Sequence, residues 1–305
     1  MTGVLIGFGI IAFVIVVGYV AGRLGIGGPS AAFALNRVAF FITNPALLFT
    51  VLARADLHEV FSASVVIAAV SAIVTAGLYI VASRLFFRRP VPETTIGALG
   101  AGYVNANNIG LPVAVYVLGS ASFVAPVLLL QLIVFAPIAL IVLDITSYGR
   151  ASVRSILLQP VRNPMILASL AGLAVDLTGW KIPDAVFQPF ELLGGAAVPL
   201  VLLAFGMALR GARPLRAAED RLQIVAASFG KAVFMPLAAW TVALLLGLHG
   251  HELFAAVALG ALPTAQNVFN FASRYQRGEA LARDTVLVTT IAAIPALLII
   301  AWLLA

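Results

Sequence analysis

The chain contains no cysteine and little charge. Without cysteine there can be no disulfides, thiolate metal sites or cysteine nucleophiles. Charged residues fill only 10% of the 305 positions, and the three histidines, His58, His249 and His251, lie outside the long apolar runs. No pair of aspartates lies at matched depth in those runs, so the groups that hydrolysis inside a membrane requires are missing. We therefore expect no enzyme activity, no metal site and no cofactor.

Hydrophobic residues, in contrast, make up 62% of the chain, and the mean hydropathy is +1.10. This composition is typical of a protein that crosses the lipid bilayer many times. At about 20 apolar residues per crossing, the sequence predicts an all-α membrane protein with ten transmembrane helices, near residues 3–22, 34–53, 60–83, 95–117, 122–145, 157–176, 186–208, 222–247, 253–273 and 284–304.

The net charge of +6 does not indicate nucleic-acid binding, because the basic residues lie in short loops between apolar runs instead of forming one solvated face. Their placement indicates orientation. Fifteen of the eighteen lysines and arginines fall in the odd-numbered connections, whereas the even-numbered connections hold only Arg54 and Lys181. Cytoplasmic loops retain basic residues, so we expect both termini to face outward.

Two of the predicted spans are interrupted in the same way. The fourth contains Asn105-Ala-Asn107-Asn108-Ile-Gly-Leu-Pro112, and the ninth contains Leu262-Pro263-Thr264-Ala-Gln266-Asn267-Val-Phe-Asn270. Proline removes a helical hydrogen bond and glycine loosens the backbone, so each span should unwind locally. In lipid, such backbone is tolerated only when it lies against protein or a polar cavity.

The positions of the two interruptions predict an inverted repeat. Pro112 and Pro263 are 151 positions apart, close to half of the chain. Residues 1–150 would form a first five-helix repeat, and residues 151–305 a second one that enters the membrane from the opposite side. The fourth and ninth helices are equivalent in such a pair, so the two breaks should meet near the bilayer midplane. Asn105, ten residues or about 15 Å beyond Thr95, fits this depth.

Polar residues gather at these breaks and predict a binding site for a small organic anion. Carboxamides donate and accept hydrogen bonds, and half-helices beginning at about Pro112 and Pro263 would aim free N–H groups and positive dipole ends at the space between them. The alternative is that the carboxamides only join helices together. The candidate residues at the breaks are Asn105, Asn107, Asn108, Pro112, Pro263, Thr264, Gln266, Asn267 and Asn270.

Three further residues are candidates outside the breaks. Lys231 lies nine residues into the eighth predicted span, where an unpaired ammonium is costly. It could attract the anion, occupy the place of a coupling cation, or pair with a backbone carbonyl for structure alone. Asn44 and Pro45 in the second span could line the cavity or permit bending.

These residues resemble the auxin efflux carrier family in its compact bacterial form. The resemblance rests on Asn105–Pro112, on Asn44-Pro-Ala-Leu-Leu-Phe49 and on Pro263-Thr-Ala-Gln-Asn267. It implies a fold like that of the bile acid sodium symporters, in which helices 1, 2, 6 and 7 form a scaffold and helices 3–5 and 8–10 form a mobile transport domain. It also implies an elevator-type transporter of the bacterial inner membrane, with a possible homodimer through the scaffold.

The resemblance implies an organic anion as cargo, either a small carboxylate such as malate or malonate or an auxin-like acid. The short connection from Thr146 to Ile156 favours the carboxylate. Lys231 near the breaks would make sodium unnecessary, which leaves proton coupling or potential-driven movement open. An anion channel and an intramembrane enzyme are the alternative functions; two inverted halves favour alternating access over a symmetric pore.

Overall fold

The computed structural model describes residues 2–54, 57–148, 158–209 and 220–305, and every element in these ranges is a helix. The α-helices are α1 (Thr2–Arg23), α2 (Ala31–Val38), α3 (Asn44–Leu52), α4 (Leu57–Ala82), α5 (Val91–Gly102), α6 (Leu111–Tyr116), α7 (Ala125–Leu130), α8 (Ala136–Tyr148), α10 (Gln159–Arg162), α11 (Pro164–Thr178), α12 (Asp184–Gly195), α13 (Ala197–Ala208), α14 (Arg221–Phe229), α15 (Met235–Leu245), α16 (Gly250–Gly260), α17 (Gln266–Tyr275) and α18 (Glu279–Leu304). A short 3-10 helix, η4 (Ala121–Phe123), precedes α7.

Seven helical segments of the described ranges are long and apolar enough to cross a membrane: Ile6–Arg23, Ala31–Leu52, Ala63–Phe87, Ala121–Ser147, Asp184–Ala208, Arg221–Leu245 and Glu279–Leu304. The fourth and ninth predicted spans do not reach this length because each is divided, into α5 and α6 and into α16 and α17. The sixth is the shorter apolar helix Pro164–Thr178. The arrangement of ten spans as an inverted repeat stays a prediction.

Within the described ranges, five π-helical turns widen the helices: η1 (Ala39–Thr43), η2 (Ser83–Phe87), η3 (Ala106–Gly110), η5 (Gln131–Phe135) and η7 (Gly230–Phe234). Four of them end two residues before a proline, at Pro45, Pro112, Pro137 and Pro236. In each of these four, the residue before the proline bonds a carbonyl five positions back, as Leu111 N does to Ala106 O. Proline lacks an N–H and clashes with the carbonyl four positions back, and a wider turn relieves both problems.

Because a π turn accommodates Pro112, the interruption of the fourth predicted span lies before the position that we expected. The second half of the fourth span begins at Ala106, not at about Pro112, and the non-helical residues are 103–105. Pro112 lies in the first turn of α6. Asn105 instead starts the half-helix, because its side chain accepts a hydrogen bond from Asn108 N at 3.1 Å. The π turn absorbs the proline without unwinding the chain.

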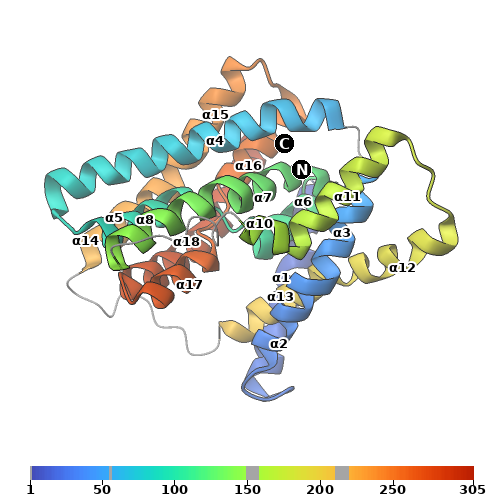
Figure 1. Ribbon diagram of the computed structural model, residues 1–305, viewed down its shortest axis with the longest axis horizontal. Coiled ribbons are helices and arrows are strands. Elements are labelled where there is room, and N and C mark those ends of the chain that lie inside the picture. The colour runs from blue at the N-terminus through green and yellow to red at the C-terminus, as the bar shows by residue number, and fades with distance from the viewer. Residues whose placement is uncertain (1, 55–56, 149–157, 210–219) are drawn as a thin grey trace.

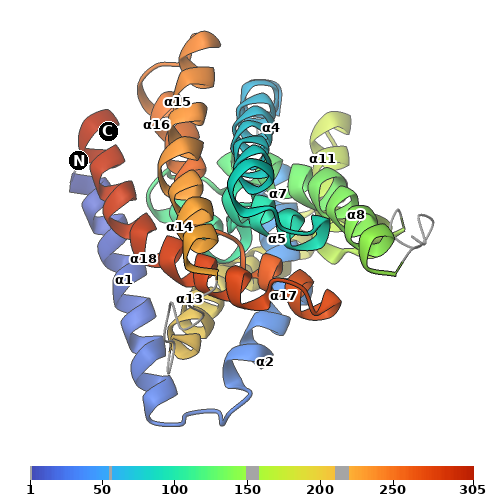
Figure 2. The ribbon, with the colours of Figure 1, turned by 90° about the vertical axis from the view of Figure 1, so that its left-hand side faces the viewer.

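The helices pack in two sets (Figure 1). In one set, α1 packs along α13, and α3 packs against α11 and α12. Gly206 of α13 allows this close approach, because a Cβ there would clash with the Ile15 carbonyl oxygen and lie 2.8 Å from Tyr19 N. In the other set, α4 packs on α5 and α15, while α18 packs on α14, α16 and α17. The first turn of α1 and the end of α18 lie close together in both ribbon views (Figures 1 and 2).

Candidate functional site: the crossing of two interrupted helices

The two interruptions pair with each other as short antiparallel segments. Val104 and Thr264 form an isolated β-bridge. Asn105 N donates to Pro263 O at 2.7 Å, and Ala265 N donates to Tyr103 O at 3.0 Å. Peptide groups that have lost their helical partners thus satisfy one another, as they must inside a membrane. We call this pairing the crossing.

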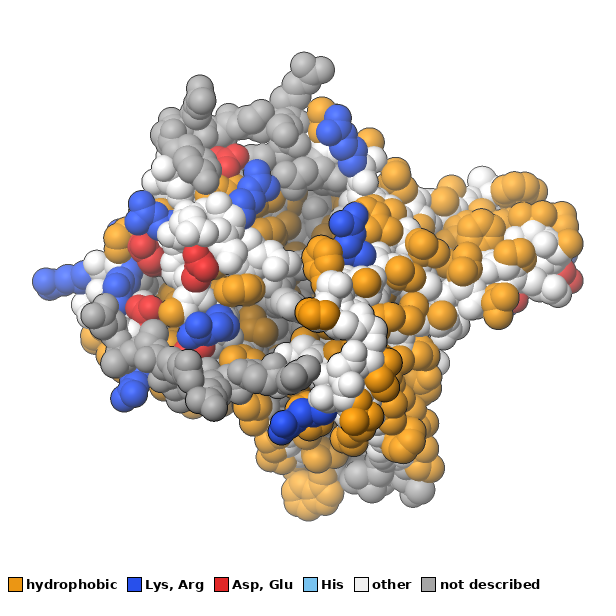
Figure 3. Space-filling view, turned by 90° about the horizontal axis from the view of Figure 1, so that it is seen from below, with side chains coloured by type: hydrophobic (Ala, Val, Ile, Leu, Met, Phe, Trp, Pro, Cys, Tyr) orange, Lys and Arg blue, Asp and Glu red, His pale blue; other side chains and the backbone are white. Residues whose placement is uncertain are grey.

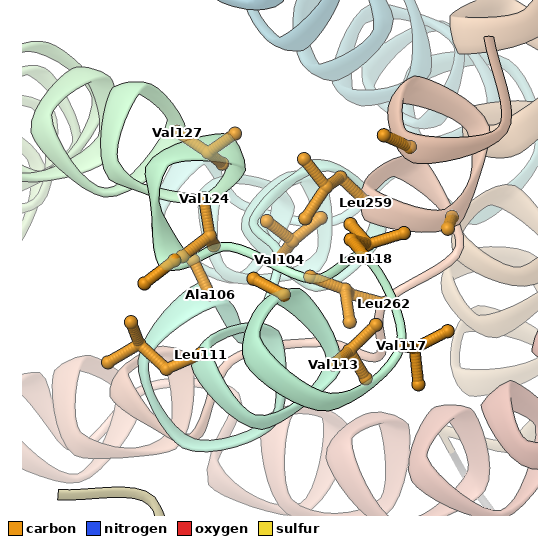
Figure 4. Close-up of a cluster of buried hydrophobic side chains, with 14 of the residues drawn as sticks. Val104, Ala106, Leu111, Val113, Val117, Leu118, Val124, Val127, Leu259 and Leu262 are labelled. Carbon is orange, nitrogen blue, oxygen red and sulfur yellow. The ribbon is translucent and has the colours of Figure 1, made fainter. Parts of the chain in front are cut away.

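Apolar side chains enclose the crossing (Figure 4). Val104 comes from the first interruption and Leu262 from the second, and both lie in the same buried cluster as Leu111, Val124 and Leu259. Thr264, which is fully buried, ties the crossing to its neighbours: its hydroxyl donates to Gly100 O at 2.6 Å and its N–H donates to Thr289 Oγ1 at 3.1 Å. Thr264 therefore holds the crossing in place and does not line the carboxamide cavity described below.

A chain of carboxamides leads into the crossing. Asn44 Nδ2 donates to Asn107 Oδ1 at 2.8 Å, and Asn107 Nδ2 donates to Asn108 Oδ1 at 2.7 Å. Asn44 lies at the start of α3, in the set of helices that contains α1 and α13, and its side chain is fully buried. Its Oδ1 has no hydrogen-bond partner among the described residues. The hydrogen bond from Asn44 to Asn107 is a direct polar link between the two sets of helices.

A small cavity lies beside the carboxamides, with a volume of about 40 Å³. Five of the predicted site residues line it, namely Asn105, Asn107, Asn108, Gln266 and Asn267. Measured this way, one water needs about 10–15 Å³, so the cavity has room for roughly three waters. The described conformation is too narrow to hold an organic acid.

The other predicted residues lie outside this cavity. Pro112 and Pro45 are buried within their helices, each two residues past a π turn. Pro263 contributes its carbonyl to the crossing. Asn270 is exposed on α17, one turn beyond Asn267, and does not line the cavity. A helix presents only one face to the crossing, which is why the run of polar residues extends beyond the site.

Nine residues that line the cavity were not among the predicted site residues, and four of these form its opposite wall or add polar groups. Phe40 and Met165 come from the first set of helices and form the wall opposite the crossing. Tyr103 precedes the break directly, and its side chain hydrogen-bonds to that of Asn267. Gln131, which is buried, donates from Nε2 to Val104 O at 3.0 Å. Only Gln131 had a sequence signal, a carboxamide in the middle of an apolar span.

Lys231 is buried on the far side of the crossing and does not line the cavity. Its Nζ donates to Gly260 O at 2.8 Å and to Met235 Sδ at 3.1 Å. Gly260 is the last residue of α16, so the ammonium lies at the negative end of that helix dipole. Of the three roles considered for Lys231, its contacts fit two, pairing with a backbone carbonyl and occupying the place of a coupling cation at a helix C-terminus.

Helix N-termini and helix C-termini lie on different sides of the crossing and give the two sides opposite partial charges. The C-termini of α5 and α16 arrive at the interruptions, and the N-termini of η3 and α17 leave from them. Asn107 and Asn108 belong to η3, and Gln266 and Asn267 to the first turn of α17. The carboxamide cavity therefore lies at two positive helix ends, while Lys231 lies at a negative one. This arrangement suits an anion in the cavity.

A larger pocket of about 280 Å³ lies on the other side of Val104 and Gln131, which line both spaces. Its polar lining includes His251 and Glu252, whereas the described lining holds no lysine or arginine. The carboxylate of Glu252 would repel an organic anion. Size alone therefore does not identify the anion site, and the smaller cavity fits the chemistry better.

These features define a polytopic α-helical membrane protein with a polar site at two interrupted helices. The model of the family described as "Membrane transport protein" matches the chain over residues 8–151 and 147–301. The chain belongs to this family, the auxin efflux carrier family of transporters.

Proteins similar to this chain are also named as transporters. A protein of Rhizobium meliloti (strain 1021) named as a proposed malonate transporter is 28% identical over 91% of this chain and 88% of its own length. The transporter YfdV of Escherichia coli (strain K12) is 29% identical over 87% of this chain and 86% of its own length. The transporter MJ1031 of Methanocaldococcus jannaschii is 21% identical over 97% of each chain. The family model covers both interrupted helices.

Proposed function

We propose that this chain is a secondary transporter that carries a small organic anion, a carboxylate of the size of malonate or malate. One observation carries the proposal: six carboxamide side chains line a cavity, and five of them lie at the positive ends of η3 and α17. Carboxamide N–H groups and helix N-termini are suitable donors for a carboxylate. The similarity to a protein named for malonate supports the choice of cargo.

The proposed architecture is two inverted five-helix repeats, residues 1–150 and 151–305, in ten membrane crossings. The scaffold would comprise α1, α2, α3 and α10–α13, and the transport domain α4–α8 and α14–α18. The way the helices pack in two sets supports this division. Inverted repeats place substrate sites at discontinuous helices near the midplane, and the crossing joins two such helices.

The proposed mechanism is an elevator-type shift of the transport domain against the scaffold. The cavity of about 40 Å³ must widen before an acid can enter, and its opposite wall, Phe40 and Met165, belongs to the proposed scaffold. Separation of the two sets would open it. The hydrogen bond from Asn44 Nδ2 to Asn107 Oδ1 spans the same boundary, so it would break and re-form in each transport cycle.

Lys231 takes the place of a coupling cation in this proposal. A fixed ammonium at the C-terminus of α16 supplies positive charge where a metal cation would otherwise be stabilised by helix carbonyls. Sodium is then not required. The carrier would run on a proton gradient or on the membrane potential, in the bacterial inner membrane, as a monomer or as a homodimer through the scaffold.

Thermal unfolding should identify the cargo and the coupling together. We expect malonate or a related dicarboxylate to raise the unfolding temperature of the purified protein equally in sodium and in choline buffer, because bound ligand stabilises the folded state. Monocarboxylates and indole acids serve as comparisons. A shift that requires sodium would contradict the role of Lys231, and no shift with any organic anion would contradict the proposed function.

A reporter after Ala305 should read as outside the cytoplasm. The basic residues are concentrated in the odd-numbered connections, and Figure 3 shows Lys and Arg side chains gathered on the face seen from below. The end of α18 lies toward the opposite side in Figure 1. Paired alkaline phosphatase and green fluorescent protein fusions check the orientation, with fusions after Gly28 as the cytoplasmic control. A cytoplasmic signal after Ala305 would overturn the orientation and leave the binding site untouched.

A further inference from the structure

An apolar groove of about 390 Å³ lies between α4, α5 and α8, separate from the crossing cavity. Its floor is α5, on which both α4 and α8 pack. Figure 1 shows α5 and α8 on the side away from α3, α11 and α12, whereas α4 runs from that side across the molecule toward α11. Ile73, Ile80 and Ile138 form exposed rims. The groove therefore opens toward the lipid.

Almost every polar group along the groove is already engaged within the protein. Thr94 Oγ1 lies 2.8 Å from Ser83 Oγ, and Thr95 Oγ1 donates to Val91 O at 2.8 Å. The Tyr103 side chain hydrogen-bonds to Asn267, toward the crossing. The groove thus presents apolar surface along its length, which suits a hydrocarbon chain.

Arg84 is the exception, and it lies at one end of the groove. Its side chain is exposed, and none of the described carboxylates lies within 4.0 Å of its guanidinium. Two more arginines precede α5, but Arg88 and Arg89 do not line the groove, and Arg89 is paired with Asp220 at 3.0 Å. An unpaired guanidinium at the end of an apolar groove complements a phosphate, to which it can form two parallel hydrogen bonds.

The length of the groove matches one leaflet. Along α4 and η2 it extends from Ala72 to Arg84, twelve positions or about 18 Å at 1.5 Å per residue. This is a little over half of a roughly 30 Å hydrocarbon core. The inner end reaches Gly102 and Tyr103, at the first interruption. A single acyl chain could therefore extend from the membrane surface to the backbone of the crossing.

We propose that this groove is a binding site for one anionic phospholipid, with its phosphate on Arg84 and one acyl chain between α4, α5 and α8. The site is independent of the cargo and of the direction of transport. Because the acyl chain contacts Gly102 and Tyr103, the lipid supports the position of the first interruption. The groove would favour an anionic headgroup over a zwitterionic one, since only the former carries net charge for Arg84 to neutralise.

Native mass spectrometry of the delipidated full chain tests the proposal by titration with phosphatidylglycerol and with phosphatidylcholine of the same acyl chains. We expect one phosphatidylglycerol to be retained with roughly fivefold preference, the effect of about one basic residue at a membrane surface. Arg84→Gln should abolish the preference and Arg84→Lys should keep most of it. Arg23→Gln, which removes an arginine at the end of α1, is the charge control.

A second pair of variants tests the groove itself. Ala76→Leu places a larger side chain in the groove and should reduce retention of both lipids, whereas Gly77→Leu should not, because a Cβ at Gly77 meets no atom within 4 Å. Equal binding of the two lipids by the natural protein would overturn the proposal, as would unchanged preference in Arg84→Gln. Equal losses in Ala76→Leu and Gly77→Leu, or a dimer that excludes lipid from the groove, would overturn it as well.

Discussion

Asn107→Ala is expected to abolish uptake of malonate into proteoliposomes while leaving the protein folded. Asn107 accepts from Asn44 Nδ2 and donates to Asn108 Oδ1, so its loss breaks the carboxamide chain at its centre. Hydrogen bonds to a charged group contribute about 1.5–3 kcal/mol each, which corresponds to roughly a 10- to 100-fold loss of affinity. If thermal unfolding identifies another acid, that acid replaces malonate in the assay.

Asn267→Ala should have a comparable effect from the other interruption. Its side chain lines the cavity and hydrogen-bonds to Tyr103. The matched control is Asn270→Ala, the same substitution one turn further along α17, where the side chain is exposed and outside the cavity. Gel filtration and the unfolding temperature check folding. Normal uptake by both cavity variants, or equal loss in Asn270→Ala, would place the binding site elsewhere.

Lys231→Ala is expected to lower the unfolding temperature and to make uptake respond to sodium. The substitution leaves Gly260 O buried without its donor, at a cost of about 1–3 kcal/mol. It also removes the positive charge from the C-terminus of α16, where a sodium ion could then be stabilised. Unfolding and uptake are measured with sodium and with choline.

Lys231→Met separates the loss of charge from the loss of volume, because methionine fills much of the same space. It should show the sodium response with a smaller loss of stability. Lys181→Ala, which removes an exposed lysine outside the described helices, is the control and should change neither quantity. If sodium stabilises the natural protein as much as Lys231→Ala, Lys231 does not replace a cation.

The sequence predicted the interrupted segments well because proline, glycine and asparagine act locally on a helix. It predicted Asn105, Asn107, Asn108, Gln266 and Asn267 as candidates, and all five line the cavity. The predicted start of the fourth span's second half was wrong because the chain accommodates Pro112 with a π turn and does not unwind there. Asn163 acts just as locally: its side chain caps α11 by accepting from Met165 N.

By itself, the sequence determined that this chain lies in a membrane, that two spans are interrupted and that carboxamides gather there. These properties depend on composition and on short-range backbone chemistry. Only the tertiary structure decided that the interruptions pair through Val104 and Thr264, that Asn44 reaches Asn107 from another set of helices, and that Lys231 binds Gly260 O on the far side of the cavity. Each of these contacts depends on which way a helix face points after a π turn and on which helix packs against that face. Both depend on how separate segments pack together, which a single segment of sequence does not determine.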